Sequence, residues 1–236
     1  MKISAGTLVQ KASGLYSLPT IYTELDRKIN NPMSSLEDIA EILLDDSSLS
    51  ARLLRLVNSA MYSFPSKVDT ITRAITIIGT NQLRDLTLAT SVIALFEGID
   101  QDKVDMESFW MHSIAVGISA RTIATYRVEP NVERFYLMGL LHDIGRLIML
   151  SDMATDMSEL MDRCDATETL LHEQEDKVLG FDHGEVARLL LSDWKLPAPI
   201  VEAVGYHHHP FRSHNYFLES SIVHVADILA NGIALG

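Results

Sequence analysis

An adjacent histidine and aspartate interrupt an apolar stretch of the chain. His142 and Asp143 follow Leu140-Leu141 and precede Ile144. Imidazole and carboxylate groups are good ligands for divalent iron, manganese, zinc or magnesium. Burial of such a pair is costly unless hydrogen bonds or a bound cation compensate the carboxylate charge. The pair therefore indicates a metal site, and the alternative is a hydrogen-bonded core histidine beside a surface aspartate.

More polar side chains stand beside apolar helical segments in the same half of the chain: His112, His183, His207, His208 and Asp227. The His207-His208 doublet comes just before Pro210, where a loop can turn both imidazoles inward. Taken singly, each of these residues is more often a satisfied core or capping residue than a ligand. Their recurrence favours a shared cation, because several polar groups would otherwise be buried without compensation.

Other residues of the same types have simpler interpretations. His172 lies among acidic residues and is expected on a solvated helix face, and His214 belongs to a polar turn. His224 precedes Asp227 by three residues, so that it either holds this aspartate by a hydrogen bond or packs in the core. Cys164 lies between charged residues and is expected to be an exposed, unreactive thiol.

Composition and charge limit the class of protein. The chain has 236 residues, 47% of them hydrophobic, and 19 basic residues face 32 acidic ones, for a net charge of −13. An acidic surface repels phosphate backbones, so nucleic acid is not an expected partner. The single cysteine excludes an intrachain disulfide framework. Without a signal peptide or an apolar run of about 18 residues, we expect a cytoplasmic protein that does not enter the membrane.

The elements that must position these side chains are helices. Apolar residues recur with helical spacing and no segment shows a convincing strand alternation, which predicts an all-α fold. In the second half, helices are expected at residues 106–126, 132–150, 152–163, 167–178, 184–194 and 198–206, and from 215 to the end. The His142-Asp143 pair is thus expected inside one long helix.

The first half is expected to form its own helices. The spacing of Ser34 and Glu37 predicts a capping box. One apolar face should follow: Leu36, Ile39, Ala40, Leu43 and Leu44. Further helices are expected at residues 49–58 and 70–78, and from a Thr80/Asn81 cap to residue 96. The polar stretch at residues 97–103 predicts a division into an N-terminal helical part, 1–100, and a metal-binding bundle, 101–236.

The order of the polar residues resembles the ligand series of the HD superfamily of metal-dependent phosphohydrolases. The surrounding motifs are similar to those of its HDOD branch, the HD-related output domain. They are Leu18-Pro19, residues 53–60, residues 74–79, residues 139–145, residues 194–197 and residues 207–210. The resemblance covers nearly the whole chain, and it implies a multi-helix HD-domain-like bundle with an N-terminal helical subdomain.

The resemblance also implies a ligand set. It brings one set of residues to one centre: His112, His142, Asp143, His183 and Asp227. His207 and His208 would supply a second site, so one or two divalent ions, iron or manganese, are expected. Two ions about 3.5–4 Å apart would clamp a phosphate and generate a hydroxide near neutral pH. Asp143 would bridge the ions and serve catalysis, and Arg146 would bind phosphate, unless it is only a solvent-exposed helix charge.

One departure from the catalytic relatives bears on function. The sequence after Pro210 lacks the Gly-Tyr-Pro motif of the cyclic-di-GMP phosphodiesterases. The resemblance therefore favours a bacterial signalling module that meets a signalling protein or a phosphate-containing small molecule. The alternative is a metal-dependent phosphohydrolase acting on a nucleotide or phosphate ester. A helical scaffold in which the histidines are structural is the third reading.

Overall fold

The computed structural model describes residues 3–62, 64, 66–96 and 105–233. These residues form helices and no strand, which confirms the predicted all-α fold. The elements are α1 (Ala5–Ala12), α2 (Thr20–Ile29), α3 (Leu36–Leu44), α4 (Ser47–Val57), α5 (Ile71–Ile78), α6 (Thr80–Leu95), α7 (Met106–Tyr126), α8 (Val132–Leu141), α9 (Ile144–Asp152), α10 (Ala154–Thr167), α11 (Leu171–Leu179), α12 (His183–Asp193), α13 (Ala198–Gly205), the 3₁₀ turn η1 (Pro210–Arg212) and α14 (Phe217–Gly232).

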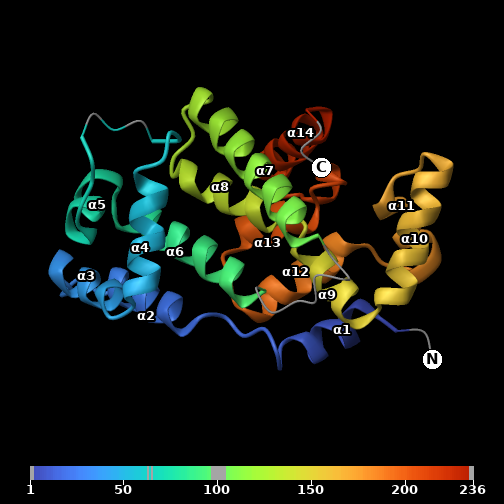
Figure 1. Ribbon diagram of the computed structural model, residues 1–236, viewed down its shortest axis with the longest axis horizontal. Helices are drawn as coiled ribbons and strands as arrows, with labels where there is room; N and C mark the ends of the chain where they lie inside the picture. Colours follow the sequence, from blue (N-terminus) through green and yellow to red (C-terminus); the bar gives the residue numbers. More distant parts are fainter. Residues whose placement is uncertain (1–2, 63, 65, 97–104, 234–236) are drawn as a thin grey trace.

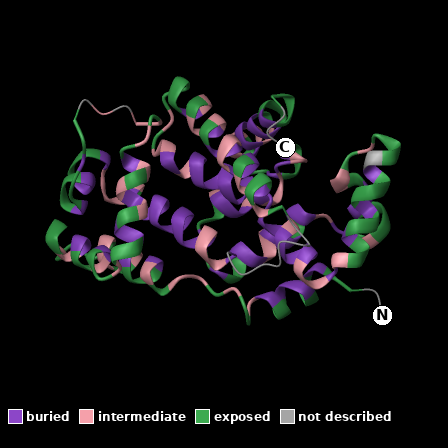
Figure 2. Cartoon of the chain, in the orientation of Figure 1, coloured by how far each residue is buried: buried purple, intermediate pink, exposed green. Residues whose placement is uncertain are grey.

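The helices are arranged along one long axis. Figure 1 shows α2 to α5 at one end, α7, α8, α12, α13 and α14 in the middle, and the α10–α11 pair at the other end. Helix α7 packs along α8 and α14, while α12 packs on α9 and α13. Buried residues run through the middle of the molecule from one end toward the other, as Figure 2 shows. The central helices are therefore the part of the fold that can hold a buried polar site.

Glycines let the central helices approach one another closely. A Cβ atom at Gly139 of α8 would lie only 2.7 Å from the Cα atom of Gly117 in α7. A Cβ atom at Gly145 of α9 would overlap the carbonyl oxygen of His183 and lie 2.9 Å from the backbone nitrogen of Ala187 in α12. The two glycines on either side of the His142-Asp143 pair thus bring α7 and α12 into contact with it.

The helix expected at residues 132–150 is interrupted at the histidine-aspartate pair. Helix α8 ends at Leu141 and α9 begins at Ile144, because Asp143 adopts φ −98° and ψ 8°. Nδ1 of His142 donates to the carbonyl oxygen of Gly139 at 2.7 Å. In a continuous helix that carbonyl would accept from the backbone N–H of residue 143. The side chain therefore replaces a backbone hydrogen bond where the helix breaks.

Several helix ends differ from their predicted positions. The capping box is formed by Ser35 and Asp38, one residue later than predicted. Leu36 and Leu44 are exposed, so that the buried face of α3 is narrower than its apolar pattern. Helix α6 begins at Thr80 after Gly79, without a side-chain cap. Turn residues at helix ends permit such shifts of one or two positions.

The thiol of Cys164 is buried, whereas exposure was expected. Helix α10 runs to Thr167, beyond the predicted end at residue 163. Cys164 consequently shares a buried face with Met157 and Leu160, at helical spacing. Helix α11 correspondingly starts at Leu171 rather than at residue 167. Charged sequence neighbours therefore did not indicate the orientation of the cysteine.

The N-terminal segment binds the second half of the chain. Nζ of Lys11 in α1 lies 3.0 Å from Asp152 at the end of α9. The indole N–H of Trp194 donates to the carbonyl oxygen of Tyr16 at 3.1 Å. Helix α1 thereby packs on α9 and α12, away from α2 to α5 (Figure 1). The stretch proposed as a boundary, residues 97–103, lies outside the described residues, so the division at residue 100 stays a prediction.

None of the helices in the described ranges has both the length and the apolar character of a membrane span.

Candidate metal centre

All of the residues predicted as ligands gather around the break between α8 and α9. They form two adjoining groups, and within each the ligand atoms lie within 4.8 Å of one another. The Asp143 group contains Asp143, His183, His207 and His208. The His142 group contains His112, His142 and Asp227. The candidate ligand atoms therefore come from α7, α12 and α14, from the break between α8 and α9, and from the turn that follows α13.

One carboxylate oxygen lies between three imidazoles. Oδ1 of Asp143 is 3.1 Å from Nε2 of His183, 3.5 Å from Nε2 of His142 and 3.7 Å from Nε2 of His207. The other oxygen, Oδ2, accepts a hydrogen bond of 2.7 Å from Nη1 of Arg146. Since His142 belongs to the neighbouring group, Oδ1 of Asp143 also links the two groups.

Backbone and carboxylate acceptors fix the orientation of the three imidazoles. Nδ1 of His142 and Nδ1 of His207 donate to the carbonyl oxygens of Gly139 and Val204, at 2.7 and 2.6 Å. Nδ1 of His183 donates to Oε2 of Glu175 at 2.6 Å. A neutral imidazole whose Nδ1 carries the proton has its lone pair on Nε2. The Nε2 atoms of all three rings, which are the atoms that would bind a metal, consequently face the Asp143 group.

Two of these nitrogens are buried without a hydrogen-bond partner among the described residues. They are Nε2 of His142 and Nε2 of His207. In addition, Nε2 of His208 lies 2.9 Å from Nε2 of His183, so that two nitrogen acceptors face each other unless a proton or cation lies between them. Buried polar atoms are normally satisfied, so this arrangement indicates a missing positive charge. A divalent cation fits these donors.

The His142 group is built in the same way. Nε2 of His112 lies 3.2 Å from Oδ1 of Asp227, and Nε2 of His142 lies 3.7 Å from the same oxygen. The side-chain amide of Asn231 donates to Oδ1 of Asp227 at 2.8 Å and holds it in place from the next turn of α14. The rings of His112 and His142 are 5.2 Å apart between centroids. At this distance between the two rings, one ion can contact both.

The distances between donors match those of a coordination shell. Two donors bound at about 2.0–2.1 Å with angles of about 90–110° lie about 2.9–3.4 Å apart. The separations of 2.9, 3.1 and 3.2 Å fall in this range, and those of 3.5 and 3.7 Å lie just above it. The donor set of imidazoles and carboxylates suits iron, manganese or zinc. Both groups can therefore hold a divalent ion.

Burial and neighbouring charges shift the pKa values of the cluster in opposite directions. Burial opposes ionisation of Asp143, but His142, Arg146 and His183 hold its pKa well below the ordinary value. Burial also opposes charging of His183, yet Glu175 and Asp143 raise its pKa to about 10 in the absence of a metal. Burial lowers the pKa of His207 and His208. The carboxylates are thus ionised and the doublet is neutral, as metal binding requires.

A pocket of about 450 Å³ opens onto both groups. Its lining includes His112, Asp143, Arg146, Leu170, Leu171, His172, His183, His208, His224, Asp227, Ile228 and Asn231. Arg146 is 26% exposed and is held by Asp143, so that it is neither a free surface charge nor buried completely. The guanidinium therefore stands where a ligand that enters the pocket would meet it.

The grouping of the ligands differs from the expected one. His142 and Asp143 were expected at one centre with the doublet apart, whereas the doublet joins Asp143 and His142 joins His112. The two side chains reach different neighbours because the helix breaks between them: His142 follows the last residue of α8, and Asp143 precedes the first residue of α9. His224 donates to the carbonyl oxygen of His207 and does not hold Asp227.

The sequence interpretation missed two residues of α11. Glu175 is fully buried and binds His183, although its acidic neighbours suggested a solvated helix. His172, expected in solvent, stacks on His208 with centroids 3.9 Å apart and lines the pocket. The spacing of Leu171, Gln174 and Glu175 places them on one helix face, which was the available signal.

Known proteins share the fold and the sequence pattern. The HDOD domain family matches residues 15–210. An HDOD domain protein of unknown function from Geobacter sulfurreducens is 26% identical, with a TM-score of 0.80 over 98% of this chain and 79% of that one. A protein from Shewanella amazonensis, described as a candidate phosphohydrolase, is 28% identical, with a TM-score of 0.77 over 99% of this chain and 83% of that one.

A curated protein of Treponema pallidum is 24% identical over 209 residues, which are 86% of this chain and 39% of that protein. The chain therefore spans less than half the length of this relative. The family match extends from the N-terminal helices to the histidine doublet and includes the break between α8 and α9. On this match, the chain belongs to the HDOD domain family.

Proposed function

We propose that the chain is a metal-binding signalling module whose centre binds a phosphate-containing ligand. The observation that carries the proposal is the convergence of three oriented imidazole Nε2 atoms on Oδ1 of Asp143. Nitrogens fixed in this way bind a cation without the cost of reorienting the rings. The ion is iron or manganese, and the two groups of ligands allow one or two ions.

The residues around the cluster have separate roles in this proposal. A bound divalent cation polarises a phosphoryl oxygen and activates water. Arg146 orients Asp143 through Oδ2 and presents its guanidinium to the pocket, where it binds phosphate oxygens. Leu170 and Ile228 supply apolar surface at the same pocket. The pocket thus combines positively charged groups with apolar side chains.

A metal-dependent phosphohydrolase is the second candidate. It is supported by the open pocket beside both ligand groups and by the Shewanella relative described as a candidate phosphohydrolase. Hydrolysis also needs a proton donor for the leaving oxygen. Burial lowers the pKa of His172 and of His208, which makes these pocket imidazoles poor proton donors near neutral pH. We therefore favour ligand binding and communication with a signalling protein over turnover.

The test loads the purified protein with Fe(II) or Mn(II) under reducing conditions and measures metal content by elemental analysis. Binding of inorganic phosphate is then followed by calorimetry, and nucleotides, cyclic dinucleotides and phosphate esters are screened for turnover. His142→Ala serves as the control for both measurements. We expect bound metal and phosphate binding in the wild type, and less bound metal and weaker phosphate binding in the variant, which keeps only the Asp143 group.

The alternatives give different results. Turnover in the wild type that disappears in His142→Ala would establish the phosphohydrolase and reject the non-catalytic module. A protein that retains no metal after loading would reject both candidates and leave a helical scaffold with structural histidines.

A further inference from the structure

Glu175 is a buried carboxylate in α11, a helix whose other acidic and lysine side chains are exposed. Its side chain is fully buried, whereas Glu173, Asp176 and Lys177 of the same helix are exposed. Both hydrogen bonds of Oε2 go to His183: it accepts from Nδ1 at 2.6 Å and from the backbone N–H at 3.0 Å. Burial of a carboxylate is costly, and helix formation by α11 does not require it. The contact with His183 therefore calls for a functional explanation.

We propose that Glu175 is a positioning residue of the metal centre, which orients the His183 imidazole so that Nε2 faces the ion. The inference rests on the metal binding proposed above. Metal-bound histidines generally donate their second ring N–H to a carboxylate or carbonyl, which fixes the ring and strengthens its basicity. His142 and His207 use backbone carbonyls for this purpose, and His183 uses the only side-chain acceptor among these three bonds.

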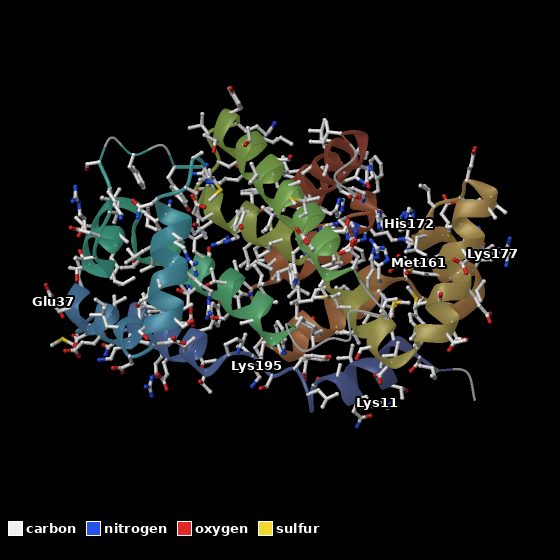
Figure 3. All side chains as sticks on the ribbon, viewed as in Figure 1. Lys11, Glu37, Met161, His172, Lys177 and Lys195 are labelled. Carbon is white, nitrogen blue, oxygen red and sulfur yellow. The ribbon has the colours of Figure 1, made fainter. Side chains whose placement is uncertain are left out.

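Helix α11 supplies a second side chain that contacts the Asp143 group. The ring of His172 stacks on that of His208, with centroids 3.9 Å apart and an angle of 14° between the planes. Figure 3 shows His172 facing the central helices, while Lys177 of α11 points to the outer side. Glu175 and His172 thus order His183 and His208, which both belong to the Asp143 group. The His142 group is oriented by Gly139 and Asn231 instead.

Because different residues orient the two groups, the proposal predicts a different effect on each group. Loss of the Glu175 carboxylate should weaken the Asp143 group and leave the His142 group intact. Two backgrounds separate the groups: His112→Ala disables the His142 group, and His208→Ala disables the Asp143 group. The dissociation constant for Mn(II) is measured in each background from the free-ion electron paramagnetic resonance signal, so that no catalytic activity is needed.

We compare Glu175→Gln and Glu175→Ala in both backgrounds. In His112→Ala, Glu175→Ala should weaken Mn(II) binding about 10- to 100-fold, the range found when such hydrogen-bonding partners are removed. Glu175→Gln keeps an oxygen acceptor and nearly the same shape, so it should recover part of the affinity. In His208→Ala, neither substitution should change the dissociation constant.

Glu133→Gln is the matched control. Glu133 is also a buried glutamate, but it pairs with Arg121 and does not contact either ligand group. The control should bind Mn(II) with the affinity of its parent. Wild-type affinity in both Glu175 variants would overturn the proposal, and so would equal losses in both backgrounds or in Glu133→Gln. Absence of Mn(II) binding before any change at Glu175 would instead reject the metal function itself.

Discussion

A proton and a metal ion would compete for one nitrogen of His183, Nε2. In the metal-free protein burial opposes its charge, but Glu175 and Asp143 outweigh burial and raise its pKa to about 10. The same nitrogen, Nε2, lies 3.1 Å from Oδ1 of Asp143 and faces His208. An incoming ion must displace this proton, and the carboxylates that attract the ion also retain the proton.

Metal affinity should therefore rise with pH. At a pH below its pKa of about 10, His183 is protonated, and an ion that binds it releases one proton. Since burial lowers the pKa of His142, His207 and His208, these imidazoles release none near neutral pH. The apparent association constant for Mn(II) should increase about tenfold per pH unit between about pH 7 and 9. A constant that is flat over this range would show that metal binding displaces no proton from His183.

Asp143 should be indispensable for metal retention by the Asp143 group but not for the helical fold. Its Oδ1 faces three imidazoles, and its Oδ2 binds Arg146. We expect Asp143→Ala to lose the ion of the Asp143 group, so that elemental analysis finds less metal than in the wild type, while the helical circular-dichroism spectrum stays close to that of the wild type. Asp143→Asn, which keeps the shape without the charge, should also lose most of the metal of this group. Wild-type metal content in either variant would identify Asp143 as a structural residue.

At the scale of elements, the break between α8 and α9 determines where the ligands point. Gly145 follows Asp143 by two residues and allows α9 to touch α12 at His183. Any side chain at this position would push these two helices apart, because the atoms that it meets belong to the backbone. The distance between Asp143 and His183 depends on this contact.

Gly145→Ala should accordingly reduce both stability and metal binding. The added Cβ would overlap the carbonyl oxygen of His183, and overpacking of this kind costs about 1–3 kcal/mol or more. Chemical denaturation and Mn(II) titration measure the two effects. Gly6→Ala in α1 is the control, because its Cβ would have its nearest neighbour at 3.9 Å, and it should stabilise the helix by up to about 1 kcal/mol. Equal behaviour of the two variants would contradict the close-contact argument.

Helical periodicity predicted the elements better than their ends. The helix expected at residues 106–126 is α7 with the same limits, because its apolar residues are continuous and the chain turns polar on both sides. The break at His142 could not be predicted from periodicity, since the apolar pattern continues across it. It coincides with a hydrogen bond from the imidazole of His142 to the carbonyl oxygen of Gly139, three residues earlier, which the spacing of apolar residues does not indicate. The family resemblance predicted which residues converge at this break but not the two groups in which they lie.

At the scale of the molecule, an acidic chain surrounds a cluster of imidazoles. The net charge of −13 attracts divalent cations and repels free phosphate, so that phosphate should bind only after a cation has entered. The composition predicts that nucleic acid is not a partner, and this stays a prediction. It could not predict the role of Glu175, because one acid among many carries no distinguishing signal in a composition. Helical spacing indicates the buried face of α11, but not that this face packs beside α12 and His183.

Metal binding should also stabilise the whole fold. The ligands come from α7, α12 and α14, the break between α8 and α9, and the end of α13, so that they cannot meet in the unfolded chain. An ion that binds only the folded state stabilises it by about 2.7 kcal/mol at a free concentration 100 times its dissociation constant. Thermal unfolding with Mn(II) should therefore shift upward, and chelation should reverse the shift. Asp143→Ala should show a smaller shift, because its Asp143 group lacks the central carboxylate and only the His142 group can still bind an ion. An equal shift in both proteins would show that no stabilising ion binds at the Asp143 group.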